Sequence, residues 1–207
     1  AAHPPAGALP VAGIQPVHHA VAARVLIDMR TAETNRLESC RVEQVRRNIQ
    51  KMININILGT ALGTKHAFRT MRPGGTTGDG GVVINIASVS AAIAFPAISV
   101  YSATKSAVDR FTRVAAMESG KLGYGVRVNS MFPGLVPTAM GAGLANDVAS
   151  LGLFGSPDEA VAAVIDQTPS GRLGTVEDMA DAVVFLASDQ AKFINGVGLQ
   201  VDGGMGM

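Results

Sequence analysis

The sequence predicts an α/β protein built around a parallel β-sheet, and three observations support this prediction. Residues 82–87 form an apolar, β-branched run, which is typical of a strand buried on both faces. Residues 126–131 form a second such run, and the stretch between them, 100–119, reads as a helix. Hydrophobic residues make up 47% of the chain and aromatic residues only 4%, which fits small-residue helices covering a parallel sheet. Strand, helix and strand in this order form a βαβ unit.

The remaining elements follow from turn and capping signals. A long helix is expected at 40–71, with a cap near Ser39 and a bend near Gly59 and Gly63. The other elements are expected as a loop at 73–81, an irregular loop at 88–99, short helical pieces within 134–156, helices at 157–167 and 175–188, and a last strand at 197–202.

The last two helices begin at recognisable starts. Pro157 follows Ser156 at the first helical position, and Thr175 has Asp178 three residues on, as in a capping box. The N-terminal end is different, because residues 1–22 carry scattered Pro, Gly and His and are expected to be an irregular or poorly ordered lead-in. With 207 residues and no linker in sight, a single α/β domain over 1–207 is the simplest organisation.

Composition excludes several classes of function. The formal net charge is +1, so nothing indicates a nucleic acid or an acidic membrane as a partner. The single cysteine, Cys40, excludes an internal disulfide and suits a reducing cytoplasm. No apolar run reaches membrane-spanning length, and no signal peptide is expected. His18, His19 and His66 lack partners at ligand spacing, so no metal site is predicted.

The chemistry concentrates in Ser88, Tyr101 and Lys105. Ser88 ends the first predicted strand, and Tyr101 and Lys105 stand four residues apart on one face of the following helix. An ammonium beside a phenol favours the phenolate form, so the three side chains make a proton-transfer set. Such a set suits carbonyl reduction or alcohol oxidation, in which an oxygen gains or loses a proton as hydride moves.

These residues stand within a longer series of motifs that resembles the short-chain dehydrogenase/reductase family. The motifs, covering about residues 45 to 207, are the segment 55–59 (Ile-Asn-Ile-Leu-Gly), 85–88 (Asn-Ile-Ala-Ser), 101–105 (Tyr-Ser-Ala-Thr-Lys), 127–130 (Arg-Val-Asn-Ser), Pro133-Gly134, 171–174 (Gly-Arg-Leu-Gly), the helix 176–188, Asn195-Gly196 and 201–204 (Val-Asp-Gly-Gly). The resemblance implies a Rossmann-like, doubly wound parallel sheet. The family's opening strand and glycine-rich turn have no match in residues 1–45. The fold is therefore expected to be N-terminally truncated or rewritten, with 23–27 as its first strand-like run.

The resemblance also implies a role for each site residue. Tyr101 would be the general acid/base, Lys105 its cationic neighbour and a ligand of the nicotinamide ribose, and Ser88 the group that holds the substrate oxygen. Asn56 would anchor a proton relay. Two alternatives stay open: Ser90 lies near Ser88, and Asn54 lies near Asn56, although Gly59 follows Asn56 at the family offset. The residues implied in binding NAD or NADP are Ala87, Tyr101, Lys105, Pro133, Gly134, Val136 and Thr138.

The implied function is NAD(P)-dependent hydride transfer to or from a secondary alcohol or ketone, with cyclic or steroid-like substrates favoured by Met131, Met140, Met205 and Met207 near the site. Two alternatives compete with it: a 3-oxoacyl-thioester reductase, and a truncated non-catalytic member with impaired cofactor binding. In this family the helix carrying Tyr and Lys packs at a subunit interface, which implies a homodimer or homotetramer. The outer face of that helix is expected to include Val108, Phe111, Thr112 and Ala115. Asn85 is expected to pair neighbouring strands.

Overall fold

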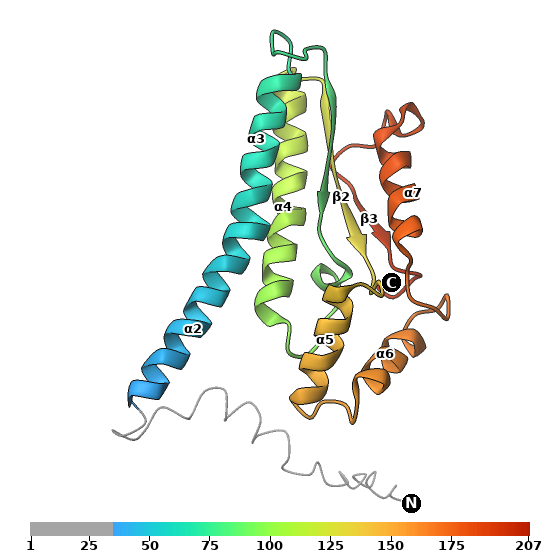
Figure 1. The fold of residues 1–207 in the computed structure, drawn as a ribbon. Coiled ribbons are helices and arrows are strands. Elements are labelled where there is room, and N and C mark those ends of the chain that lie inside the picture. Colours follow the sequence, from blue (N-terminus) through green and yellow to red (C-terminus); the bar gives the residue numbers. More distant parts are fainter. Residues whose placement is uncertain (1–34) are drawn as a thin grey trace, which may run out of the picture. The chain divides into compact units, whose positions relative to one another are not determined.

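A computed structural model describes residues 35–207 of the chain (Figure 1). The chain divides into two compact units, residues 1–47 and 48–207, and the sheet with its helices lies in the second. The elements follow in the order α2 (Asn35–Ile53), η1 (Asn54–Leu58), α3 (Gly59–Met71), β1 (Gly81–Ile86), η2 (Val89–Ala91), α4 (Ser99–Lys121), β2 (Val126–Pro133), α5 (Ala139–Ser150), α6 (Pro157–Asp166), α7 (Val176–Ala187), η3 (Asp189–Ala191) and β3 (Gly198–Val201). The predicted lead-in 1–22 and strand-like run 23–27 lie outside the described residues. The single domain over 1–207 therefore stays a prediction.

The sheet of the second unit is parallel, as predicted, with the strand order β1-β2-β3. Gly81 stands opposite Val126 and Ile86 opposite Met131, while Ser130 begins the pairing of β2 with β3 at Gly198. Helices α3 and α4 lie on one side of the strands and α7 on the other (Figure 1). This is the layering of a Rossmann-like fold, and it brings the carboxyl ends of β1 and β2 to one edge of the sheet.

The long predicted helix contains a change of helix type that the sequence did not predict. Ser39 lies inside α2 rather than at its start, so the predicted cap is wrong. In place of a bend at Gly59 and Gly63, η1 is a π-helical turn that ends just before Gly59, and both glycines belong to the regular helix α3. The backbone N–H of Gly59 bonds to the carbonyl of Asn54, five residues back. Such π-turns within α-helices are frequently found at functional sites.

Local capping explains the helices that follow β2. The hydroxyl of Thr138 accepts a bond from the N–H of Gly141 and begins α5, a single helix of 12 residues where short pieces were expected. Ser156 caps α6 with Pro157 at its first turn, as predicted. Thr175 and Asp178 form the predicted capping box at the start of α7. The irregular loop 88–99 contains the short 3₁₀ turn η2.

The face of α4 that was expected to point outward instead packs inside the chain. Val108, Thr112 and Ala115 are each at most 2% exposed, and Phe111 is half-buried against the core between α4 and the sheet. The large apolar residues exposed on α4 are Val114 and Met117. The error arose because an apolar stripe on a helix fits burial against the sheet as well as burial against a partner.

Two asparagines tie β2 to the connection that leads into β3. The amide of Asn129 donates to the carbonyl of Ile194 and its oxygen accepts from the N–H of Val197, while the side-chain oxygen of Asn195 accepts from the N–H of Val128. Asn129 is fully buried. Part of the recognised motif series, residues 127–130 with Asn195-Gly196, therefore holds the sheet together.

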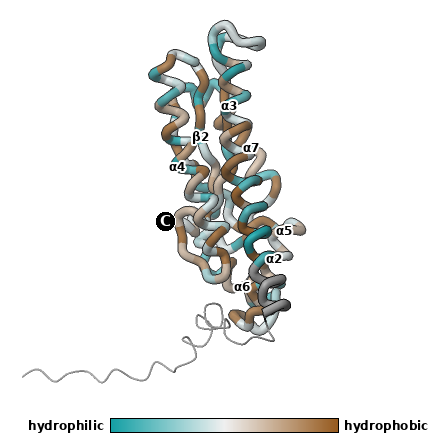
Figure 2. Tube along the Cα trace, turned by 90° about the vertical axis from the view of Figure 1, so that its left-hand side faces the viewer, coloured by the Kyte–Doolittle hydropathy of each residue, from teal (hydrophilic) through white to brown (hydrophobic). Residues whose placement is uncertain are grey.

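Helix α7 is mostly apolar along its length, which Figure 2 shows in brown, yet part of its apolar surface faces solvent. Val184 is 66% exposed, whereas Leu186 is almost completely buried. Within residues 35–207, no helix combines the length and hydropathy needed to cross a bilayer.

Candidate active site

Ser88 lies directly after β1, where the chain leaves the sheet. Its hydroxyl accepts a hydrogen bond from the backbone N–H of Ser90 (3.2 Å), and its carbonyl accepts from the N–H of Ala91 (2.9 Å), so it caps the turn η2. No acceptor for the Ser88 hydroxyl proton lies within residues 35–207. A serine held by an N–H at its oxygen keeps its own proton available for a ligand oxygen.

Tyr101 and Lys105 lie near the start of α4 on one side, as their spacing predicted. The ammonium of Lys105 lies 5.7 Å from the ring centre of Tyr101 and donates to the carbonyl of Ile86 at the end of β1 (2.8 Å). Lys105 has no carboxylate partner in the described part of the chain. Burial lowers the pKa of Lys105 below its ordinary value of 10.5. The site thus contains an unpaired, partly desolvated amine beside a phenol.

Asn56 lies in the π-turn η1 and reaches α4. Its amide donates to the hydroxyl of Thr104 (2.9 Å), and that hydroxyl donates to the carbonyl of Tyr101 (2.8 Å). The alternative residue, Asn54, instead accepts a bond from Gln50 along its own helix on an exposed face. Asn56 is therefore the asparagine that is linked to the Tyr-Lys segment, although the relay role implied for it stays a prediction.

Thr104 is the contact residue that the sequence did not single out. It is 2% exposed and joins η1 to the first turn of α4 through the two bonds just described. Its one sequence signal is its place directly before Lys105. Its partner Asn56 lies 48 positions away in sequence. Their contact could not be predicted from the sequence, because it depends on how two helices pack.

The loop after β2 runs beside the end of β3. The N–H of Gly134 donates to the carbonyl of Val201 (3.0 Å), and a Cβ on Gly134 would lie 3.0 Å from the Cα of Asp202. Pro133 is the last residue of β2. Val136 is half-buried, and its carbonyl accepts from the N–H of Thr138 (2.7 Å). The loop is thus fixed against the sheet, next to the edge where Ser88 lies.

Asn85, Ala87 and the four methionines were also singled out in the sequence. The backbone of Asn85 stands opposite Ser130 in the pairing of β1 with β2, while its side-chain amide donates to the hydroxyl of Thr112 on α4 (2.9 Å) and so links strand to helix. Ala87 is buried directly before Ser88. The four methionines do not share one surface, since Met131 is buried while Met140 and Met207 are 78% and 93% exposed.

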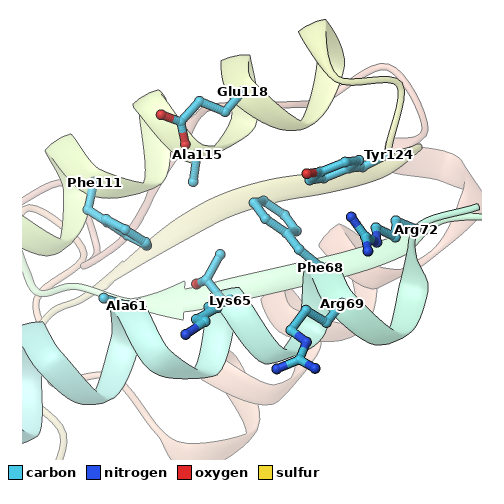
Figure 3. A pocket seen from close by; sticks show the side chains of 10 residues that line it. Ala61, Lys65, Phe68, Arg69, Arg72, Phe111, Ala115, Glu118 and Tyr124 are labelled. Atoms are coloured by element: carbon cyan, nitrogen blue, oxygen red, sulfur yellow. The ribbon is translucent and has the colours of Figure 1, made fainter. Parts of the chain in front are cut away.

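A cavity of about 280 Å³ lies between α3 and α4, apart from the predicted site residues (Figure 3). Phe68 and Tyr124 meet edge to face between the two helices, and the cationic side chains at its rim are Lys65, Arg69 and Arg72. Arg72 follows the end of α3, close to the start of β1. Because Ser88 follows the other end of β1, these cations do not line the surroundings of the Ser-Tyr-Lys group.

Comparison with known proteins identifies the family. Residues 29–206 match a family model described as enoyl-(acyl carrier protein) reductase. The chain is 39% identical over 156 residues to 2-(S)-hydroxypropyl-CoM dehydrogenase 3 of Xanthobacter autotrophicus, a match that covers 75% of this chain and 56% of that protein. The chain belongs to the short-chain dehydrogenase/reductase family. It spans little more than half the length of that curated relative.

Solved structures give the same fold. The structure resembles sorbitol-6-phosphate 2-dehydrogenase from Erwinia amylovora with a TM-score of 0.68 and 26% identity, over 78% of this chain and 61% of that one. It also resembles 3-ketoacyl-(acyl-carrier-protein) reductase from Brucella melitensis, solved as a complex with NADH, with a TM-score of 0.63 and 29% identity over 78% and 59% of the two chains. The Rossmann-like fold predicted from the sequence is confirmed.

The residues at this edge of the sheet fit the nicotinamide half of a dinucleotide. Lys105 offers an ammonium that lacks an ionic partner among residues 35–207, and its partial burial lowers its pKa. A hydroxyl-rich ribose can replace the carbonyl of Ile86 as its acceptor.

Proposed function

We propose that this chain carries the catalytic part of an NAD(P)-dependent oxidoreductase that acts on a secondary alcohol or ketone. The observation that supports it best is the position of Lys105, which lies beside the Tyr101 ring and bonds to Ile86, two residues before Ser88, while Asn56 is linked to the same helix through Thr104. Similarity to 2-(S)-hydroxypropyl-CoM dehydrogenase 3 and to sorbitol-6-phosphate 2-dehydrogenase agrees with a CH–OH substrate.

The proposed roles follow from the contacts of each side chain. Ser88 donates its free hydroxyl proton to the substrate oxygen and stabilises charge that develops there. Tyr101 takes the proton of the alcohol during oxidation and returns it to the oxygen during reduction. Lys105 places positive charge beside the Tyr101 ring and hydrogen-bonds the ribose. When bound, NAD or NADP accepts or supplies the hydride.

The loop 133–138 is proposed to cover the nicotinamide. Its anchoring to β3 through Gly134 and Val201 keeps it close to the Ser88 edge. Val136 would offer its backbone to the carboxamide, while Thr138 would bond the carboxamide or a phosphate in addition to capping α5. Ala87 and Pro133 would pack against the ring. Similarity to a reductase solved with NADH supports this arrangement.

Among substrates, we favour small secondary alcohols and ketones, cyclic ones included, over acyl thioesters. A thioester carried by a phosphopantetheine arm would need cations near the site, and the cluster Lys65, Arg69 and Arg72 lies toward the opposite end of β1. We further propose a homodimer or homotetramer and, from the single Cys40, a cytoplasmic location.

Tyr101→Phe is the decisive test of the enzyme proposal. The variant should lose turnover of a secondary alcohol with NAD or NADP by about 10²-fold or more, because it removes the acid/base hydroxyl and little else. Steady-state kinetics measures that loss, and a titration of NAD(P)H fluorescence measures cofactor binding, which should survive the change. The non-catalytic alternative holds if the wild type binds no cofactor at millimolar concentration.

A further inference from the structure

Ser90 stands out because its hydroxyl is buried and has no hydrogen-bond partner among residues 35–207. Its side chain is 5% exposed, and only one other buried side chain in the described part of the chain, Thr64, shares this condition. A buried hydroxyl without a partner is unfavourable by about 1–3 kcal/mol. Each such group in a folded protein therefore calls for an explanation.

The position of Ser90 explains why its hydroxyl has no partner. Ser88 and Ser90 belong to the same single turn, in which the N–H of Ser90 holds the Ser88 oxygen at 3.2 Å. The turn is fixed against α4, since Ser106 donates to the carbonyl of Ala91 (3.4 Å) one residue after Lys105. The unpartnered hydroxyl thus lies two residues from the group proposed to hold the reacting oxygen.

A serine hydroxyl can change direction without moving the backbone. Rotation about χ1 carries it between three staggered positions. Turning breaks no hydrogen bond to the residues described, because the Ser90 hydroxyl makes none with them. Turning toward a ligand oxygen would give the buried hydroxyl the partner that it lacks.

We propose that Ser90 is a specificity-determining residue that binds a second oxygen of the substrate, carried on a carbon next to the reacting one. The substrate class is then a vicinal diol, hydroxyketone or hydroxy acid rather than a simple alcohol. This inference rests on the proposed function, because it takes Ser88 as the ligand of the reacting oxygen. A hydroxyl that binds this second oxygen also discriminates against substrate analogues without it, because such analogues leave the hydroxyl unpaired.

The test compares two probes, trans-cyclohexane-1,2-diol and cyclohexanol, with the full chain and NAD or NADP. Wild type should prefer the diol in kcat/KM, and Ser90→Ala should reduce that preference by about threefold to tenfold, the effect of one hydrogen bond. Ser106→Ala removes a nearby hydroxyl that already has a partner, and it should leave the preference unchanged.

A thermal melt without substrate provides an independent readout. Ser90→Ala should melt at the same temperature as wild type or higher, because it removes an unpaired buried hydroxyl. A lower melting temperature would show that the hydroxyl already has a structural partner and would overturn the proposal, as would an unchanged probe preference in an active enzyme. Failure of the proposed function looks different: wild type would turn over neither probe, and the role of Ser90 would fall with it.

Discussion

At the scale of single residues, Lys105 shows how function and stability oppose each other in this site. Its ammonium is partly removed from water, and in the described residues it meets a backbone carbonyl rather than a carboxylate. Burial disfavours the charged form, so the folded state binds this proton less tightly than the unfolded chain does. The buried charge of Lys105 therefore lowers the stability of the fold, while it leaves an ammonium that can bind a ligand.

Lys105→Met tests this opposition, because methionine keeps an unbranched, apolar stem. Turnover should fall by about 10²-fold or more. Stability at neutral pH should be equal or higher, since the desolvated charge is gone. The lowered pKa of Lys105 sets the pH dependence: wild type should gain stability as pH rises through the window below 10.5, where the folded state has lost the proton and the unfolded state still holds it.

Urea unfolding of both proteins between neutral pH and pH about 10.5 measures the effect. The advantage of the variant should be largest at neutral pH and disappear toward the alkaline end. A variant that is less stable at every pH would show that the hydrogen bond from Lys105 to Ile86 outweighs the burial of the charge.

Residue types predicted the candidate site better than they predicted individual contacts. Ser88, Tyr101 and Lys105 were singled out from a short stretch of sequence with fixed spacing, and in the structure Lys105 lies beside the Tyr101 ring and bonds to Ile86, two residues before Ser88. Thr104 could not be found in this way, because its partner Asn56 comes from another helix. Thr112 was placed on the wrong side of α4, since its bond to Asn85 becomes visible only once strand and helix are packed.

At the scale of elements, the contact between η1 and α4 joins the two helices that carry the site. It consists of Asn56, Thr104 and the carbonyl of Tyr101 in series. A second contact of the same kind, Asn85 to Thr112, joins β1 to α4 further along the same helix. Both threonines are buried, but only the first is connected to the segment with Tyr101.

Thr104→Val should separate positioning from stability. Loss of the hydroxyl leaves the Asn56 amide without its acceptor and should reduce the free energy of unfolding by about 1–3 kcal/mol. Turnover should also fall about tenfold or more, because a small displacement of the reacting groups lowers the reaction rate strongly. Steady-state kinetics and urea unfolding give the two quantities.

Two matched variants complete this experiment. Thr104→Ser keeps the hydroxyl and should restore most of the turnover. Thr112→Val leaves Asn85 unpaired instead and should destabilise the protein to a similar degree while leaving turnover per folded molecule close to wild type. Equal losses of turnover in Thr104→Val and Thr112→Val would contradict a positioning role for Thr104.

Helix boundaries were predictable where capping chemistry is local. Thr175 with Asp178, and Ser156 with Pro157, mark the starts of α7 and α6 in the sequence and in the structure. The extent of α5 as one helix was not predicted, because its Gly- and Ala-rich stretch has weak periodicity and its start depends on the Thr138 cap.

At the scale of the whole molecule, the described sheet leaves apolar surface uncovered. Within residues 35–207, β1 and β3 each pair only with β2, so each keeps one unpaired edge. Apolar residues are exposed on both helical layers, with Met117 on α4 at 68% and Val184 on α7 at 66%. Such surfaces favour association with another chain.

Met117→Lys should weaken self-association if the outer side of α4 is the interface. Light scattering of wild type should show a dimer or tetramer, and the variant should need at least about tenfold more protein to assemble, because a buried charge without a partner opposes the contact. Val184→Lys places the same charge on α7 and serves as the control, which should assemble like wild type. A monomeric wild type would contradict the proposed oligomer.

The π-turn at 54–58 has a consequence for the register of the chain. An α-helix closes each turn with a bond four residues back, whereas here Gly59 bonds five residues back to Asn54. The turn therefore accommodates one extra residue, and each residue of an α-helix accounts for about 100° of rotation. Deleting one residue from 54–58 would therefore restore a regular α-helix whose side chains before and after the turn face as they do now, while the side chains within the turn would change direction. The chain retains a residue that a regular helix does not need, and with it Asn56 faces Thr104.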